Sequence, residues 1–185
     1  MSEAFPQFIR DIPNSHSTVW RIKNGAEITV QYALRTHYER LEALLREECP
    51  GFQNDIRRYF MPGPGIARMA TEHGHIRGGL LLDNFLKEQG TIVLRNIVVE
   101  SALRRHRIGS ALIAGIVRTS EKICREKHLY ARDEFDLVMC AENEDYELQG
   151  FLHANGFTPF EGDIEQCQCE ENQLLRKRRI LVSYT

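Results

Sequence analysis

The most informative segment of this 185-residue chain reads Val99-Glu-Ser-Ala-Leu-Arg-Arg-His-Arg-Ile-Gly-Ser-Ala-Leu-Ile113. It has the character of a buried strand end, a short basic turn and a helix that opens on small residues. Free N–H groups and the macrodipole favour a phosphate at a helix N-terminus, and Gly109 lets the backbone approach a ligand closely. The segment contains neither Gly-Lys-Ser/Thr nor G-x-G-x-x-G, so it is not a P-loop or a dinucleotide-binding turn. We predict an anion site here; the alternative is a solvated basic helix start.

The flanking sequence predicts a mixed α/β domain. Downstream, residues 107–127 carry apolar side chains along one face, as in a helix that packs on a sheet. Upstream, residues 91–99 are apolar on both alternating faces, as in a central strand covered on both sides. Asn24-Gly25 predicts a type I′ turn between two further strands, and residues 1–16 are expected to be irregular. Strands are also expected at 18–23, 27–32, 66–71, 75–82, 136–141, 157–160 and 174–184, and helices at 36–48, 52–60 and 144–154.

The composition excludes several classes of protein. The chain is 42% hydrophobic and 27% charged, and 24 Lys plus Arg against 26 Asp plus Glu give a net charge of −2. Nucleic-acid binding usually needs a basic excess, and a membrane span needs about 20 apolar residues in a row, so neither partner is expected. No signal peptide is visible, and the five scattered cysteines are typical of reduced thiols. We therefore expect a cytoplasmic protein. No metal is expected, because Cys167 and Cys169 lack a second pair of ligands.

The segment resembles the acyl-CoA motif of the GCN5-related N-acetyltransferase (GNAT) family. That motif, Val-x-Pro followed by Arg/Gln-x-x-Gly-x-Gly/Ala, is matched by Val99-Glu-Ser101 and by Arg104-Arg-His-Arg-Ile-Gly109. A second signature, an Asn and a helix ahead of Gly-Phe, is matched by Asn143 and by Gly150-Phe-Leu-His-Ala-Asn-Gly-Phe157. The order of expected elements also agrees from about Glu27 to Tyr184. The resemblance implies a GNAT-like, splayed central sheet with flanking helices (the acyl-CoA N-acyltransferase fold) over residues 27–185, preceded by an N-terminal extension, 1–26, with room for an extra strand.

The resemblance also implies how acetyl-CoA would bind as a co-substrate. Its pantetheine arm would lie between the fourth and fifth strands of the family's sheet, its pyrophosphate on the basic turn, and its acetyl thioester near Arg95, Asn96 and Cys140. The implied cofactor-binding residues are Ile97, Val98, Val99, Arg104, Arg105, His106, Arg107, Ile108, Gly109, Ser110 and Asn143.

Two positions depart from the family pattern. Arg107 replaces the first glycine of the motif, so its side chain must turn outward if its amide is to bind phosphate. Leu152 replaces the tyrosine that serves many members as the general acid, and leucine cannot donate a proton. Tyr146 is a candidate substitute; otherwise catalysis would rest on positioning and on hydrogen bonds to the oxyanion.

The general base is expected among a few polar residues. Glu72 is the first candidate, and Glu142, at the end of a strand, is the second. His73 and His75, beside Glu72, could serve instead, because an imidazole titrates in the right range. Each could equally be an exposed residue at a strand end. Cys140 is interpreted as a core residue rather than a nucleophile. The candidate catalytic residues are Glu72, Asn96, Glu142 and Tyr146.

An acidic stretch suggests the acceptor. Residues 161–171 contain Glu161, Asp163, Glu165, Glu170 and Glu171 without Lys or Arg, and in the resembled fold this loop borders the acceptor site. It would attract a cationic acceptor, although a solvated loop is the alternative. The expected function is direct acetyl transfer from acetyl-CoA to a primary amine of a small molecule, protein or peptide. A catalytically degenerate acyl-CoA-binding sensor or interaction module is the alternative, and a homodimer stays open.

Overall fold

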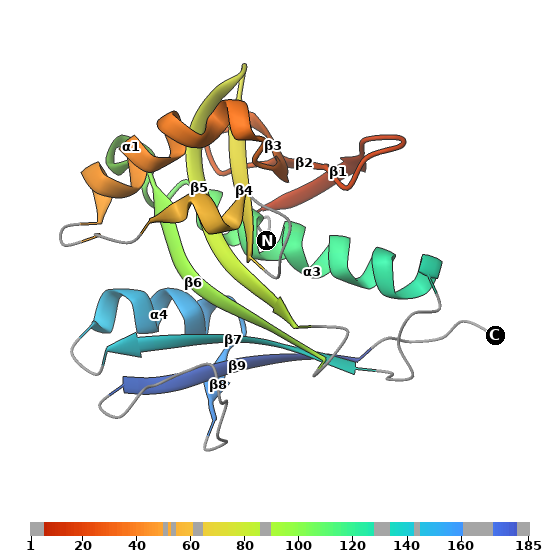
Figure 1. Ribbon diagram of the computed structural model, residues 1–185, viewed down its shortest axis with the longest axis vertical. Helices are drawn as coiled ribbons and strands as arrows, with labels where there is room; N and C mark the ends of the chain where they lie inside the picture. Colours follow the sequence, from red (N-terminus) through yellow and green to blue (C-terminus); the bar gives the residue numbers. More distant parts are fainter. Residues whose placement is uncertain are drawn as a thin grey trace.

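A mixed α/β architecture is present in the computed structural model, which describes residues 6–49, 52, 55–60, 65–85, 90–127, 134–142, 145–160 and 172–180. The strands of this part form one sheet in the order β1-β2-β3-β4-β5-β6-β7-β9-β8 (Figure 1). The strands are β1 (Gln7–Asp11), β2 (Thr18–Arg21), β3 (Glu27–Tyr32), β4 (Gly65–Glu72), β5 (His75–Phe85), β6 (Thr91–Val99), β7 (Glu134–Glu142), β8 (Thr158–Pro159) and β9 (Asn172–Ile180). The α-helices are α1 (Tyr38–Glu48), α3 (Ile108–Lys127) and α4 (Tyr146–Ala154), and the 3-10 turns are η1 (Arg35–His37), η2 (Ile56–Tyr59) and η3 (Ser101–Leu103). None of these helices is long and apolar enough to cross a membrane.

Two hydrophobic clusters cover the two faces of the sheet. The larger includes Leu80 of β5 and Ile108 of α3, whereas the smaller includes Leu81 of β5 with residues of α1 and η2. Leu80 and Leu81 belong to different clusters because successive side chains of a strand point to opposite faces. Gly78 and Gly79 allow the helices to approach β5 from both sides. A Cβ atom on Gly78 would lie 3.2 Å from Ile108 Cγ2, and one on Gly79 would overlap Leu41 of α1.

The predicted splay between two central strands is confirmed. Parallel strands β6 and β7 pair from Thr91 with Asp136 to Leu94 with Met139. Pairing ends there, although β6 continues to Val99 and β7 to Glu142. Arg95 forms a bulge at this point, since Leu94 pairs with Leu82 of β5 and Asn96 with Leu81. A bulge bends its strand and increases the local twist, and Figure 1 shows β6 and β7 diverging beyond it.

Some local predictions were wrong. Residues 52–60 form no α-helix in their described part, which contains only the 3-10 turn η2. Asn24-Gly25 does not form a type I′ turn, because only Gly25 of the pair has a positive φ. Gly25 N donates to Ile22 O and Ile22 N to Ala26 O, which makes a three-residue loop ending in a glycine bulge. The two-residue turn with both φ angles positive is instead His73-Gly74, between β4 and β5.

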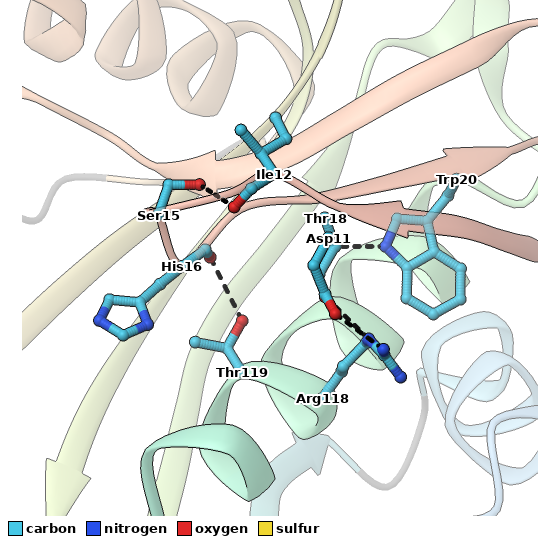
Figure 2. Close-up of polar contacts among 8 residues, drawn as sticks. All are labelled: Asp11, Ile12, Ser15, His16, Thr18, Trp20, Arg118 and Thr119. Atoms are coloured by element: carbon cyan, nitrogen blue, oxygen red, sulfur yellow. Dashed lines mark hydrogen bonds and ion pairs between the residues drawn. The ribbon is translucent and has the colours of Figure 1, made fainter. Parts of the chain in front are cut away.

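The N-terminal extension is more ordered than expected. Residues 7–11 form β1, which pairs with β2, and β2 pairs with β3, so the extension continues the sheet. Figure 2 shows how it is anchored on α3: Arg118 donates to both carboxylate oxygens of Asp11 at 2.9 and 2.8 Å. The Thr119 hydroxyl donates to the carbonyl of His16 at 3.3 Å. Strand pairing and these contacts explain why residues without a strong local signal adopt a fixed structure.

Candidate functional site

The basic turn leads into the N-terminus of α3, as the sequence predicts. Ala111 N donates to Arg107 O at 3.0 Å, which is the first hydrogen bond of the helix. The N–H groups of Ile108, Gly109 and Ser110 therefore have no acceptor inside the helix. Backbone amides at such a position, together with the helix macrodipole, bind anions.

The turn itself adopts a conformation that is unusual for arginine. Arg105 has φ 65° and Arg107 has φ 73°, both in the left-handed region. For a residue with a Cβ atom this conformation costs about 1–2 kcal/mol. Glycine adopts such a conformation without this cost. The Arg107 side chain is exposed, so it points away from the core as expected from the sequence.

Two distant elements hold the turn in place. Lys23 N, in the loop between β2 and β3, donates to His106 O at 3.1 Å. On the other side, Glu48 at the end of α1 accepts from Ser101 N at 2.7 Å and from Arg104 Nη2 at 2.9 Å. Only 6% of the Glu48 side chain is exposed. Arg104 therefore has a carboxylate partner that the sequence analysis missed, because more than 50 residues separate the two.

Gly109 has a packing role as well as a place in the motif. A Cβ atom at this position would lie 3.0 Å from two ring atoms of Phe151 in α4. From the sequence, this glycine is predicted to allow close approach of a ligand. In the structure, the group that approaches closely is the Phe151 side chain, so Gly109 allows α4 to pack against the start of α3.

Tyr146, the candidate general acid, and Leu152 differ in exposure, and the role of Tyr146 stays a prediction. Leu152 is fully buried in the larger hydrophobic cluster. Tyr146, six residues earlier in α4, is 77% exposed. The two side chains therefore have different environments, and Leu152 contributes to the core rather than to proton transfer.

Glu72, the first candidate base, lies far from Asn96. It ends β4 and accepts from Arg77 Nε at 3.2 Å, while Arg77 Nη1 donates to Glu100. Glu72 pairs with His75, whereas Asn96 pairs with Leu81, six residues further along β5. At about 3.4 Å per residue this separates them by about 20 Å along the strand. The structure therefore does not bring Glu72 and Asn96 together.

Several other predicted residues are only partly visible. Asn96 and the segment Ile97–Val99 lie on β6 beyond the bulge. Glu142 ends β7, but its side chain and that of Cys140 lie outside the described residues, as do Asn143 and residues 161–171. Their contribution stays a prediction.

A charged cluster that the sequence analysis missed lies on the face covered by η2. Asp83 of β5, with a side chain only 4% exposed, accepts from Arg58 Nη2 at 2.9 Å through both oxygens and from Arg95 Nε at 2.7 Å. Arg95 is the bulge residue at the point where β6 and β7 separate. Burial, and then the charge of Asp83, raises the pKa of the neighbouring Tyr59 hydroxyl. The local signal was an aspartate that interrupts the apolar run of β5.

Among the described residues, no group of three or more His, Cys, Asp or Glu side chains could hold a metal ion. Cys49 and Cys124 are free thiols, and burial raises the pKa of each. Thiolate is the form that reacts with electrophiles and binds metals. Neither cysteine is therefore an activated nucleophile.

Comparison with known proteins identifies the fold. No protein-family model and no curated protein sequence matches the chain. The GNAT domain of S. lividans PAT superposes with a TM-score of 0.69 at 12% identity, covering 91% of this chain and 100% of that chain. The chain has the GNAT fold. A GNAT-family acetyltransferase from Staphylococcus aureus Mu50 (TM-score 0.60, 18% identity) covers 84% of this chain and 99% of its own. PaiA N-acetyltransferase from Thermoplasma acidophilum was solved in complex with coenzyme A. It superposes with a TM-score of 0.57 at 13% identity, covering 82% of this chain and 99% of its own.

The open part of this GNAT fold has the chemistry that an amide-rich, anionic ligand needs. Ile97, Val98 and Val99 pair with β5 on one side, but β7 no longer pairs with β6 on the other. Their strand edge thus faces the gap, close in sequence to the amides of the α3 N-terminus. Strand edges present unpaired N–H and C=O groups. One ligand with both amide and phosphate groups would satisfy both features.

Proposed function

We propose that the protein transfers an acetyl group from acetyl-CoA directly to a primary amine. The observation that carries this proposal is the splay, where pairing of β6 with β7 stops at Leu94 and Met139 while the α3 N-terminus begins nearby in the chain. The GNAT fold of the chain supports it. One structural neighbour of 18% identity, AAC(6')-Iy, was solved in complex with a bisubstrate analogue of CoA (TM-score 0.56).

In this proposal, Ile97, Val98 and Val99 bind the pantetheine amides through their backbone. Residues 104–110 bind the pyrophosphate, with the amides of α3 as the principal donors. Acetyl-CoA supplies an activated acyl group and a thiolate leaving group; a free thiol has a pKa of about 8.5. Because Leu152 supplies no proton, catalysis rests on positioning the amine and on N–H groups at the splay that stabilise an oxyanion. Asn96 and Glu142 remain the candidates for assisting the amine.

A matched pair of variants at Arg107 tests the cofactor site. Arg107→Asp places a negative charge at the N-terminus of α3, which favours the helix dipole but repels a pyrophosphate. Arg107→Asn has nearly the same shape without the charge, and both residues tolerate a positive φ. In a calorimetric titration with acetyl-CoA, we expect one-to-one binding at micromolar affinity, about −8 kcal/mol, for the wild type. The Asn variant should bind similarly and the Asp variant should not bind. Equal binding by both variants would show that the pyrophosphate does not lie on this turn.

A second candidate function is an acyl-CoA-binding sensor without catalysis. The observations that favour it are the buried Leu152, which cannot donate a proton, and the high exposure of Tyr146, six residues earlier in α4. The two functions differ in turnover. Release of CoA thiol in the presence of an amine panel supports the transferase, whereas tight binding with no release supports the sensor. The panel should include spermidine and a lysine-rich peptide, because the acidic residues 161–171 suggest a cationic acceptor.

A further inference from the structure

The charged cluster of Arg58, Asp83 and Arg95 lies on the sheet face that η2 covers, and it indicates which kind of acceptor the site binds. Asp83 shares the face of Leu81, which packs against α1 and η2, whereas Leu80 and Leu82 pack against α3. A carboxylate that is 96% shielded from water is costly unless it is paired. Here two guanidinium groups, from Arg58 and Arg95, donate to the same oxygen, Oδ2. Asp83 is thus a fixed anchor for two cations.

Arg58 is the member of this cluster that faces solvent. Its two hydrogen bonds to Asp83 both come from Nη2, and 60% of its side chain is exposed. The guanidinium also lies 4.8 Å from the ring centroid of Tyr59, a distance at which a cation is attracted to an aromatic face. Arginine has five donors in a planar fork, so a guanidinium held in this way presents further donors outward.

The backbone of η2, which contains Arg58, packs closely against the sheet. A Cβ atom at Gly65 of β4 would lie 2.9 Å from Arg58 O and 3.1 Å from Tyr59 Cδ1. Gly65 pairs with Asp83 across the β4–β5 ladder. The glycine therefore allows η2 to rest on the strand next to the buried carboxylate. A binding group fixed by its surroundings loses little conformational freedom on binding a ligand.

The cluster also lies at the splay. Arg95, which shares Asp83 with Arg58, is the bulge residue that follows the last β6–β7 pair. We infer that the amine acceptor of the proposed transfer carries an anionic oxygen group, a carboxylate or a phosphate, which Arg58 binds. This inference rests on the proposed function and names the acceptor class of the same site, in place of the cationic acceptor that residues 161–171 suggest. Arg58 contacts Asp83 through Nη2 alone, so its remaining donors can bind a second anionic group.

The test compares acceptors that differ only in the anionic group. The panel contains the twenty amino acids, each as the free acid and as the carboxamide, together with phosphoethanolamine paired with ethanolamine, and spermidine. Release of CoA thiol from acetyl-CoA is measured with the full-length protein. We expect the free acids or the phosphate to be acetylated at least tenfold more efficiently than their neutral partners. The difference in basicity works against this expected result. The amine of a carboxamide is less basic than that of the free acid, so more of it is in the neutral, nucleophilic form at pH 7.

Three variants identify the residue responsible. Arg58→Gln should raise KM for the preferred anionic acceptor on the order of ten- to a hundredfold, with a smaller change in kcat, because one charged hydrogen-bond partner is lost. It should also abolish the difference between acid and amide. Arg58→Lys keeps the charge and should retain part of that difference. Arg57→Gln is the matched control, since Arg57 lies in the same turn, pairs with Asp55 and does not contact Asp83.

Failure of this inference can be distinguished from failure of the proposed function. If acetyl-CoA does not bind in calorimetry, the proposed function is overturned and the inference with it. If acetyl-CoA binds but no amine is acetylated, the sensor is supported and the acceptor assignment is wrong. If spermidine or the amides are preferred, or if Arg58→Gln retains the preference for acids, the transferase stands and the inference alone fails.

Discussion

Arg107 is the residue at which the chain departs most clearly from the resembled motif. Its φ of 73° lies in the left-handed region, which glycine adopts without a steric cost. Sequence alone identified the replacement but could not give the backbone conformation at this position. The structure shows a left-handed residue, at a conformational cost of about 1–2 kcal/mol for a residue with a Cβ atom.

We expect Arg107→Gly to stabilise the protein. Glycine removes the cost of the left-handed conformation, and its greater freedom in the unfolded chain offsets part of that gain. The net change in the free energy of unfolding should be between zero and about +1 kcal/mol, measured by urea denaturation. Arg105→Gly is a second test, because Arg105 has φ 65°. Loss of stability in both variants would mean that the arginine side chains make contacts worth more than the strain.

Gly109→Ala should act in the opposite direction. The added methyl group would lie 3.0 Å from the Phe151 ring, and overpacking of this kind costs about 1–3 kcal/mol. The free energy of unfolding of Gly109→Ala, Phe151→Leu and the double variant forms a cycle. We expect the double variant to lose less stability than the sum of the single variants, because leucine leaves room for the methyl group. Strictly additive effects would show that the cost of the added methyl group does not arise from its contact with Phe151.

At the level of elements, Glu48 connects α1 to the turn that precedes α3. Glu48→Gln keeps an acceptor for Ser101 N but removes the charge that Arg104 faces. We expect a loss of about 1–2 kcal/mol in the free energy of unfolding, since hydrogen bonds to charged groups contribute more than neutral ones. Glu47→Gln is the matched control, because the neighbouring side chain is exposed, and it should change stability by less than about 0.5 kcal/mol. Equal effects of the two variants would contradict a connecting role for Glu48.

The elements also show what local sequence can predict. The helix at 107–127 and the strand at 91–99 were predicted well, because their hydrophobic periodicity is a local property of many residues. β1 was missed, because a short edge strand owes its structure to β2 and to Arg118, which lie elsewhere in the chain. The Asn24-Gly25 turn was mispredicted because the pairing of β2 with β3 ends at Arg21 and Glu27, which leaves a longer loop than a type I′ hairpin allows.

In the site, too, the parts formed by one continuous segment could be predicted, and the parts assembled from distant segments could not. The basic turn is a continuous segment, so its residues could be predicted from the motif. The cluster of Arg58, Asp83 and Arg95 is assembled from η2, β5 and β6, and only the register of the sheet brings these residues together. An aspartate after three leucines indicates a charged side chain in a buried strand, but the sequence does not show that its partners are Arg58 and Arg95.

At the scale of the whole molecule, the N-terminal strands extend the sheet and also fix its position relative to α3. The β2–β3 loop donates to the carbonyl of His106 in the turn before α3, and β1 is held to the middle of α3 through Asp11 and Arg118 (Figure 2). Arg118 also lies 3.7 Å from the ring centroid of Phe8. The extension therefore supports the helix whose N-terminus forms the predicted anion site.

The ion pair between Asp11 and Arg118 predicts a specific pH dependence of stability. The hydrogen bond from Arg118 lowers the pKa of Asp11 below its usual value of 3.8, although partial burial opposes this. Since the pKa is lower in the folded protein than in the unfolded chain, the pair stabilises the fold above about pH 4. This stabilisation is lost as the pH falls through the lowered pKa of the folded state. Asp11→Asn should therefore reduce the free energy of unfolding at pH 7 by at most about 1 kcal/mol, as for other exposed pairs.

The difference between the wild type and Asp11→Asn should shrink as the pH is lowered from 5 to 2 and as salt is raised to about 1 M, where charges are screened over about 3 Å. Urea denaturation at each condition measures it. A difference that stays constant with pH and salt would mean that Asp11 acts by packing rather than by charge. In that case β1 would be held on α3 mainly by the contact of Phe8 with Trp20 and Arg118, and Phe8→Ala would then be the more destabilising substitution.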